Sequence, residues 1–192
     1  MSNGGTREIV VPVRVGRVLM QEGIGLPKPE DEAFDAIHAV EARICFTMLT
    51  EILSRRDHSV GEVRSKLSDY GFRCEEIEPV IARALEMRFL NDARFAMHFI
   101  DERKRRGWGR RKIEIELRRK GVDVAELPGY PDEYFDDEED LERAMALLNR
   151  KQIPESRAFE KLVRHLMAKG FPFSVASKAA HQRLEDVQTD LF

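Results

Sequence analysis

The chain has 192 residues, of which 35% are charged, and its 32 basic and 35 acidic side chains leave a net charge of −3. This length suits one or two ordinary domains or a short repeat array, and a composition this charged, with a single Trp, favours exposed helices over one large core. The N-terminus lacks a basic start followed by an apolar run, and no apolar stretch approaches membrane-spanning length, so we expect neither a signal peptide nor a membrane segment. Cys45 and Cys74 lie far apart without a CxxC spacing, which is typical of buried or inert thiols in a reducing compartment. We expect a cytoplasmic protein.

Residues 1–33 differ in pattern from the rest of the chain. The run from Ile9 to Val15 is rich in β-branched residues and predicts a strand, but Pro12 restricts it to an edge strand or an isolated ribbon. Gly23, Gly25, Pro27 and Pro29 follow, a pattern that is typical of a linker. We therefore expect a short irregular or β-like N-terminal arm over residues 1–33 that is mobile or loosely docked.

From about Glu32 the apolar residues follow a helical period. The pattern predicts a long first helix from Phe34 to Arg56. A second helix begins at a capping box, in which the Ser59 hydroxyl accepts from the amide of Glu62, and it ends at Gly71. A third helix follows, with apolar residues in phase at positions 77, 81, 84 and 85.

One helix-ending motif recurs three times. Val63-x3-Leu67-x3-Gly71-Phe72 is followed by Ile113-x3-Leu117-x3-Gly121-Val122 and then by Leu162-x3-Leu166-x3-Gly170-Phe171, at offsets of 50 and 49 residues. A glycine just after a helix adopts the left-handed conformation, and the apolar residue after it packs back on the last turn. Three copies in one register predict an all-α array of tandem three-helix repeats over residues 41–90, 91–140 and 141–187.

The second repeat departs from this pattern in its third helix. Pro131 stands at the position equivalent to Ile81, and Pro128-Gly129 precedes it, so we expect this helix to be short, displaced or missing, with the acidic run 132–142 covering the gap. In the third repeat we expect apolar contacts from residues 141–148, a helix from Pro154 to Lys169 and a last helix from Ser174 to Leu184.

Charge is strongly segregated along the middle of the chain. Between Asp101 and Lys120, ten basic residues stand against four acidic ones, a local net charge of +6, whereas residues 123–142 hold ten acids and no Lys or Arg. The acids of the basic segment do not interleave at i,i+4 spacing to neutralise it, and on a helical wheel Arg111, Lys112, Arg118 and Arg119 lie opposite the apolar Ile113–Leu117 face. The segment predicts binding to a polyanion or an acidic protein surface, although a solvated helix face is the simpler alternative. The candidate contact residues are Arg103, Lys104, Arg105, Arg106, Trp108, Arg110, Arg111, Lys112, Arg118, Arg119 and Lys120.

Trp108 has two interpretations of equal weight. It stacks on an exposed base or enters a protein pocket, or it closes the corner between the helices of its own repeat. No pattern indicates catalysis. The five histidines show no metal-ligand spacing with Cys or with each other, the acid pairs at 136–139 are consecutive and read as a solvated run, and Gly107-Trp108-Gly109 lacks the residues of a phosphate loop. We expect no enzyme activity, metal or cofactor.

The repeats resemble the RecX family, regulatory proteins of the RecA recombinase. The resemblance covers about residues 41–187 and is most specific in Asp92-x2-Arg94-Phe95-Ala96, Arg103-x3-Gly107 and Ile113-x3-Leu117-x2-Lys120-Gly121-Val122. It implies an elongated, curved helical protein that lies in the groove of a RecA–DNA filament and limits filament growth or promotes disassembly. RecA activity in recombination, DNA repair and the SOS response would then be restrained. We expect a monomer.

The alternative function is direct binding of single- or double-stranded DNA, because Ser59–Phe72 alone also fits a helix-turn-helix element. No repeat, however, offers the polar set at a helix start that base-edge contacts need. A purely structural helical adaptor is a third interpretation.

Overall fold

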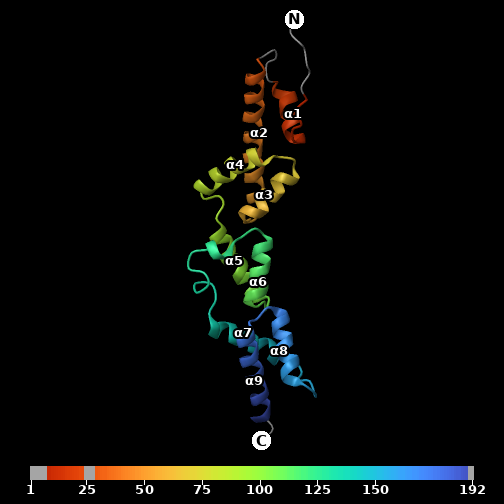
Figure 1. The fold of residues 1–192 in the computed structure, drawn as a ribbon, viewed down its shortest axis with the longest axis vertical. Helices are drawn as coiled ribbons and strands as arrows, with labels where there is room; N and C mark the ends of the chain where they lie inside the picture. Colours follow the sequence, from red (N-terminus) through yellow and green to blue (C-terminus); the bar gives the residue numbers. More distant parts are fainter. Residues whose placement is uncertain (1–7, 24–28, 190–192) are drawn as a thin grey trace. The chain divides into compact units, whose positions relative to one another are not determined.

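The computed structural model describes residues 8–23 and 29–189, and this part of the chain is helical without any β-strand (Figure 1). The elements in chain order are α1 (Val13–Glu22), α2 (Glu30–Leu53), α3 (Val60–Asp69), α4 (Cys74–Glu86), α5 (Asp92–Arg105), α6 (Arg110–Arg119), the short 3-10 helix η1 (Val124–Glu126), α7 (Asp137–Asn149), α8 (Ala158–Lys169) and α9 (Phe173–Thr189). The predicted all-α class is confirmed. The chain divides into two compact units, one up to Asn91 and one from Asp92.

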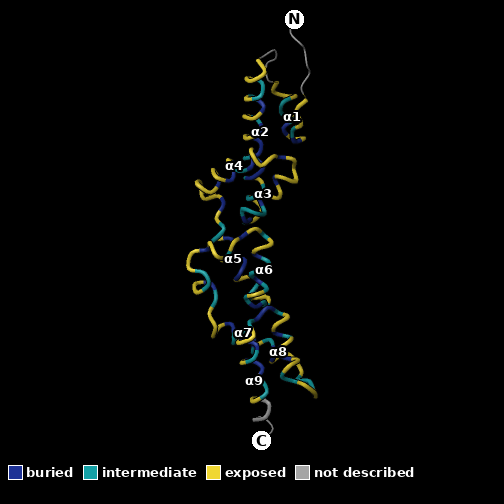
Figure 2. The backbone as a smooth tube through the Cα atoms, viewed as in Figure 1, coloured by how far each residue is buried: buried dark blue, intermediate teal, exposed yellow. Residues whose placement is uncertain are grey.

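The core of the first unit lies among α2, α3 and α4. Leu49, Val63 and Leu67 are fully buried there, and Ile77 and Ile81 of α4 join them. Figure 2 shows the buried positions following one side of these helices. The Ser59 hydroxyl accepts the amide of Glu62 at 3.1 Å, which confirms the predicted start of α3.

The N-terminal arm contains a helix rather than a strand, so the β-like prediction was wrong. Val11, Val15, Val18 and Leu19 recur at helical spacing and pack against the first core, with Val15 completely buried. Pro12 immediately precedes the helix, a place that proline tolerates because no intrahelical N–H is needed there. Arg14 reaches across to Glu51 of α2 with two hydrogen bonds of 2.6 Å. The arm is therefore docked, while residues 1–7 and 24–28 of the predicted arm and linker lie outside the described residues.

Replacing Val15 by Asp is expected to release α1 from α2. A buried carboxylate without a partner is costly, so α1 would leave the core instead and the first unit would lose the burial of this face, about 2 kcal/mol. Urea unfolding checks the loss. Val13→Asp is the matched control, because Val13 is 73% exposed on the same helix and should unfold like the parent. Equal midpoints for the two variants would contradict the docking.

The second unit holds two cores. The first joins Phe95, Phe99, Ile113 and Leu117 of α5 and α6, and the second is built from α7, α8 and α9 around Phe171. Tandem three-helix organisation is thus confirmed, whereas the residue boundaries at 90/91 and 140/141 stay a prediction.

The recurring helix ends are confirmed in detail. Gly71, Gly121 and Gly170 have φ of 92°, 76° and 96°. The next residue of each motif donates its amide to the carbonyl of the predicted leucine, at 3.2 Å (Phe72 to Leu67), 3.0 Å (Val122 to Leu117) and 3.1 Å (Phe171 to Leu166). All three apolar residues after the glycines are buried. The motif is therefore the predicted six-residue helix stop.

The third helix of the second repeat is reduced to η1, as Pro131 predicts. Aromatic side chains cover the gap: Tyr134 is buried, and Tyr130 and Phe135 pack against the α5–α6 core. Tyr134 and Phe135 belong to the acidic run 132–142, so the run contributes its aromatic residues to this gap, whereas most of its acids serve the start of α7. Asp136 accepts the amides of Glu138 and Glu139 at 3.0 and 2.8 Å, and acids in a first turn interact favourably with the helix dipole.

Two smaller expectations also change. The helix α8 begins at Ala158 and not at Pro154. Cys45 is buried, and burial raises the pKa of its thiol to about 12, but Cys74 is exposed, so only one of the two thiols is a core residue. No helix among the described residues is long and apolar enough to cross a membrane.

Candidate binding surface

The basic segment folds as the end of α5, a tight turn and α6. Gly107 has a φ of 76°, and the Trp108 amide donates to the Arg103 carbonyl at 3.0 Å. This is the same helix stop as at the three repeat motifs, here with Trp as the residue that packs back. The spacing Arg103-x3-Gly107-Trp108 matches the helix-ending motif, but its first residue is a cation where the three repeat motifs have a leucine.

The start of α6 lies directly on the end of α8. The Gly109 amide donates to the Lys169 carbonyl and the Arg111 amide to the Gly170 carbonyl, both at 2.9 Å. The two backbones approach so closely that a Cβ on Gly109 would stand 2.2 Å from the Phe171 nitrogen. Amides that often bind phosphate at a helix N-terminus are therefore occupied here, so the Gly-Trp-Gly turn is a packing element.

Several predicted contact cations are instead part of the fold. Arg103 and Lys112 flank the Trp108 ring, with the guanidinium carbon and the ammonium nitrogen 5.0 and 4.0 Å from its centre. Lys104 is only 11% exposed and pairs with Glu139 of α7 at 2.7 Å. Trp108 is half-buried between its cations and packs against the α5–α6 core, which favours the interpretation that it closes the corner of its own repeat.

Arg110 belongs to a partly buried polar triad. Its Nε donates to Glu114 at 2.7 Å, and the Tyr130 hydroxyl donates to the same carboxylate oxygen. Burial, and after it the Glu114 carboxylate, raises the pKa of Tyr130 to about 12, so the hydroxyl stays protonated as a donor at neutral pH. The triad fastens the segment after η1 to α6.

The expectation that acids do not neutralise the basic segment was wrong. Arg106 pairs with Glu102 and Arg110 with Glu114 at i,i+4, and Arg119 pairs with Glu116 at i,i+3 and 2.7 Å. The counter-charges precede or follow their arginines by one turn, a geometry that helix register supplies on its own. Lys120 also has a contact, lying 5.5 Å from the centre of the Phe99 ring.

Among the described residues, three predicted arginines remain exposed without a carboxylate partner: Arg105, Arg111 and Arg118. Arg111 and Arg118 lie on the solvent side of α6, seven residues apart and hence on one face. Arg105 donates only to the Asp101 carbonyl, at 3.2 Å. These three side chains are the part of the predicted surface that is available to a partner.

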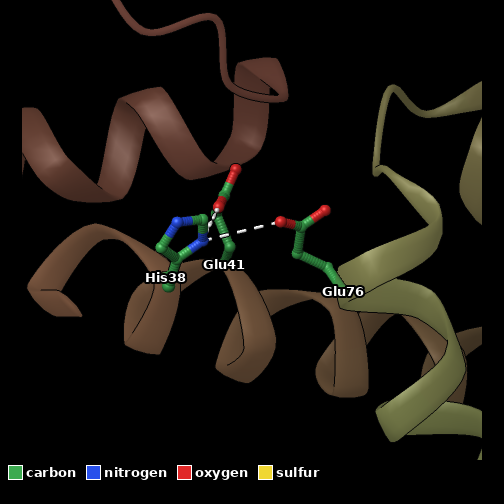
Figure 3. A group of neighbouring side chains, drawn as sticks. All are labelled: His38, Glu41 and Glu76. Atoms are coloured by element: carbon green, nitrogen blue, oxygen red, sulfur yellow. Dashed lines mark ion pairs between the residues drawn. The ribbon is translucent and has the colours of Figure 1, made fainter. Parts of the chain in front are cut away.

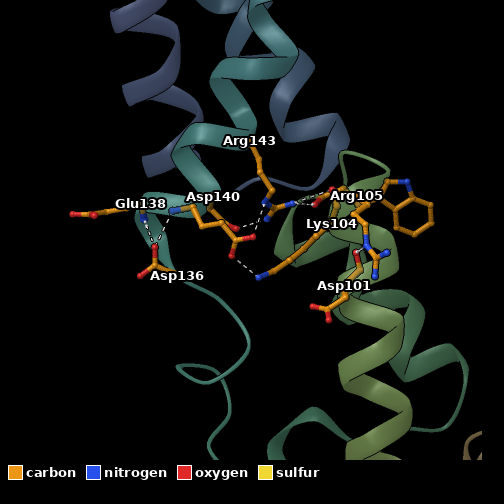
Figure 4. Close-up of polar contacts among 9 residues, drawn as sticks. Asp101, Lys104, Arg105, Asp136, Glu138, Asp140 and Arg143 are labelled. Carbon is orange, nitrogen blue, oxygen red and sulfur yellow. Dashed lines mark hydrogen bonds and ion pairs between the residues drawn. The ribbon is translucent and has the colours of Figure 1, made fainter.

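Arg105 also borders a cavity of about 490 Å³ between α5 and α7. Five cations line this cavity against two acids, and the complete lining is Asp101, Lys104, Arg105, Arg106, Gly107, Glu139, Arg143, Ala146, Leu147 and Arg150. Figure 4 shows Arg143 and Lys104 converging between the two helices. The cavity lining has an excess of cations, some of them paired with acids, and sequence reasoning did not find it.

Arg143 and Arg150 of this cavity were missed because they follow the acidic run. Arg143 donates to the Trp108 carbonyl at 2.8 Å and pairs with the buried carboxylate of Asp140, so it fixes α7 to the corner after α5. The run 136–140 is accordingly not a merely solvated one. Arg150, at the C-terminal end of α7, is exposed and has no carboxylate partner within the described ranges.

Comparison with known proteins identifies the family of this chain. The model of "RecX, second three-helix domain" matches residues 91–125, which contain all eleven predicted contact residues, and that of "RecX, first three-helix domain" matches residues 46–83. The regulatory protein RecX of Vibrio vulnificus is 32% identical over 131 residues, covering 67% of this chain and 86% of the relative. The chain belongs to the RecX family. RecX of Mannheimia succiniciproducens is 31% identical over 137 residues, with the same coverage of each chain.

Solved RecX structures share the fold. The crystal structure of RecX from Lactobacillus salivarius superposes with a TM-score of 0.67 at 20% identity, covering 76% of this chain and 97% of that one. Another crystal structure of regulatory protein RecX gives a TM-score of 0.66 at 22% identity, covering 83% and 82%. The tandem three-helix repeats are thus the RecX architecture.

Proposed function

We propose that this RecX family chain binds the RecA–DNA filament and lowers RecA activity in recombination, DNA repair and the SOS response. The family membership supports RecA as the partner, as does the resemblance of the second repeat. The observation that supports the binding site is a group of four exposed arginines on or next to α5, α6 and α7 that have no carboxylate partner: Arg105, Arg111, Arg118 and Arg150. Guanidinium groups recognise carboxylates and phosphates in two-pronged geometry, and a RecA–DNA filament offers both.

Mixed charge favours the filament over bare DNA as the partner. Asp132, Glu133 and Glu142 of the same unit are exposed, and a uniform polyanion would be repelled by them. A protein–DNA surface with both signs of charge suits such a pattern better. The described residues also contain no fully basic helix face, because Arg106, Arg110 and Arg119 are already paired with acids.

Reversing the charge of Arg111 and Arg118 together is expected to weaken inhibition of RecA about tenfold or more, since each tenfold corresponds to about 1.4 kcal/mol and contacts between close opposite charges commonly exceed this. The measurement is ATP hydrolysis by RecA on single-stranded DNA, titrated with the parent and with Arg111→Glu/Arg118→Glu. Both side chains are exposed, so the variant should melt like the parent. A second pair, Arg105→Glu/Arg150→Glu, tests the cavity in the same titration.

The matched control is Arg17→Glu/Arg164→Glu, which makes the same change in charge at two other exposed positions. It should inhibit RecA like the parent. Full inhibition by a folded Arg111→Glu/Arg118→Glu variant would remove α6 from the binding surface. Equal affinity of the parent for filament and for bare DNA, with log K falling against log salt by about 0.7 to 0.9 per phosphate contacted, would favour direct DNA binding instead.

A further inference from the structure

A second polar cluster lies in the first unit, on α2 and α4. His38 and Glu41 stand one turn apart on α2, and Glu76 faces them from the first turn of α4 (Figure 3). The His38 Nδ1 lies 3.1 Å from the Glu41 Oε2 and 3.5 Å from the Glu76 Oε1. One ligand atom from each residue falls within 4.8 Å of both others. Two helices thus aim one imidazole and two carboxylates at a common point.

The two carboxylates are buried, which is unusual for a merely solvated cluster. The Glu41 side chain is 2% exposed, and its Oε2 lies within ion-pair distance of His38 and Arg73 but makes no well-aligned hydrogen bond. Glu76 is held in place, because its Oε2 accepts the Arg73 amide at 3.0 Å. Burial first, and then the neighbouring Glu76 carboxylate, raises the pKa of Glu41. Two neighbouring buried carboxylates are costly to keep ionised unless a positive charge lies close to both.

The Arg73 guanidinium supplies part of the positive charge that the two carboxylates need. Its guanidinium lies 2.5 Å from the Glu76 Oε1 and 3.5 Å from the Glu41 Oε2, and its side chain is half exposed. One monovalent charge therefore serves two buried carboxylates, and it makes no hydrogen bond to the Glu41 Oε2. Because the guanidinium reaches in from the surface, it is free to swing outward when another cation takes its place.

We propose that His38, Glu41 and Glu76 bind a divalent transition-metal cation of the Zn²⁺ class. A tetrahedral ion with bonds of about 2.1 Å has its ligand atoms about 3.4 Å apart, and the two measured edges are 3.1 and 3.5 Å. One imidazole nitrogen with carboxylate oxygens is a donor set that such ions accept. The Arg73 amide orients the Glu76 ligand as an outer-shell partner. Water completes the coordination on the side where His38 is 48% exposed.

Metal binding would fasten α2 to α4. The ligands come from two helices whose packing builds the first core, so the bound state is the folded state and binding adds to its stability.

The test is titration of the chelator-treated full chain with ZnCl2 by calorimetry, and with CoCl2 by visible absorption. All proteins carry Cys74→Ser, which removes the exposed thiol as a competing ligand. We expect one ion per chain and a higher melting temperature. His38→Ala and Glu41→Gln should each weaken binding at least tenfold, whereas the control His181→Ala, whose ring contacts Ser177 and Phe159, should bind like the parent.

Absence of binding by the parent, or unchanged affinity in His38→Ala, would overturn the proposal and leave the Arg73 guanidinium as the counter-charge of the two carboxylates. His38 is half exposed, so His38→Ala is expected to fold even if Glu41→Gln does not. Circular dichroism of each variant verifies this. Because the readouts are metal affinity and melting temperature, the result is independent of any effect on RecA.

Discussion

Gly109→Ala is expected to destabilise the second unit by about 3–5 kcal/mol. The added Cβ would stand 2.2 Å from the Phe171 nitrogen and 2.4 Å from the Gly170 carbonyl carbon, and both obstacles are backbone atoms that no rotamer change removes. Relief requires α6 and α8 to separate. That movement breaks the hydrogen bonds from Gly109 to Lys169 and from Arg111 to Gly170, so an overpacking cost is added to that of two lost hydrogen bonds.

Urea unfolding followed by circular dichroism measures this loss. Gly170→Ala should produce a loss of similar size, because its Cβ would meet the Lys112 Cβ at 2.4 Å and its φ is 96°. Gly16→Ala is the control. Its nearest neighbour is the Val11 Cγ2 at 3.8 Å, an ordinary contact, and an alanine inside α1 should stabilise by up to about 1 kcal/mol. If Gly109→Ala unfolds at the parent's midpoint, the close backbone crossing does not exist.

This crossing also marks the limit of what the sequence predicts. The helix stops were predictable because every atom involved lies within six residues: a glycine with positive φ and the residue after it. Gly109 has no such local role. Its need for a hydrogen side chain comes from the backbone at Gly170 and Phe171, which no spacing or periodicity connects to it. The sequence therefore left two interpretations of Trp108 open and gave no sign that Gly109 packs on the end of α8.

The same distinction explains the other errors. In α1, packing against α2 overrides the strand preference of a valine-rich segment, a tertiary effect that propensity does not contain. The prediction for the charged segment was wrong for a different reason, because the net charge of a segment does not show which side chains pair with each other. Lys104 reaches Glu139, and Arg143 reaches the Trp108 carbonyl, only once α7 lies against α5. The candidate surface therefore shrinks from eleven residues to the few arginines that the fold leaves without acids, and gains Arg150.

Leu117→Ala is expected to cost the second unit about 2–5 kcal/mol, because it removes a fully buried side chain from the point where the α5–α6 core and the helix stop meet. The carbonyl of residue 117 still accepts the Val122 amide, so the backbone turn stays possible while its apolar contact is lost. Thermal and urea unfolding report the change.

Ile115→Ala is the control on the same helix, since Ile115 is 47% exposed and its truncation should cost at most about 0.5 kcal/mol. Gly121→Val tests the glycine of the helix stop separately. It should also destabilise the second unit, because a β-branched residue resists the φ of 76° found there. Should Leu117→Ala and Ile115→Ala lower stability by the same amount, Leu117 does not anchor the repeat, and the recurring motif marks helix ends alone.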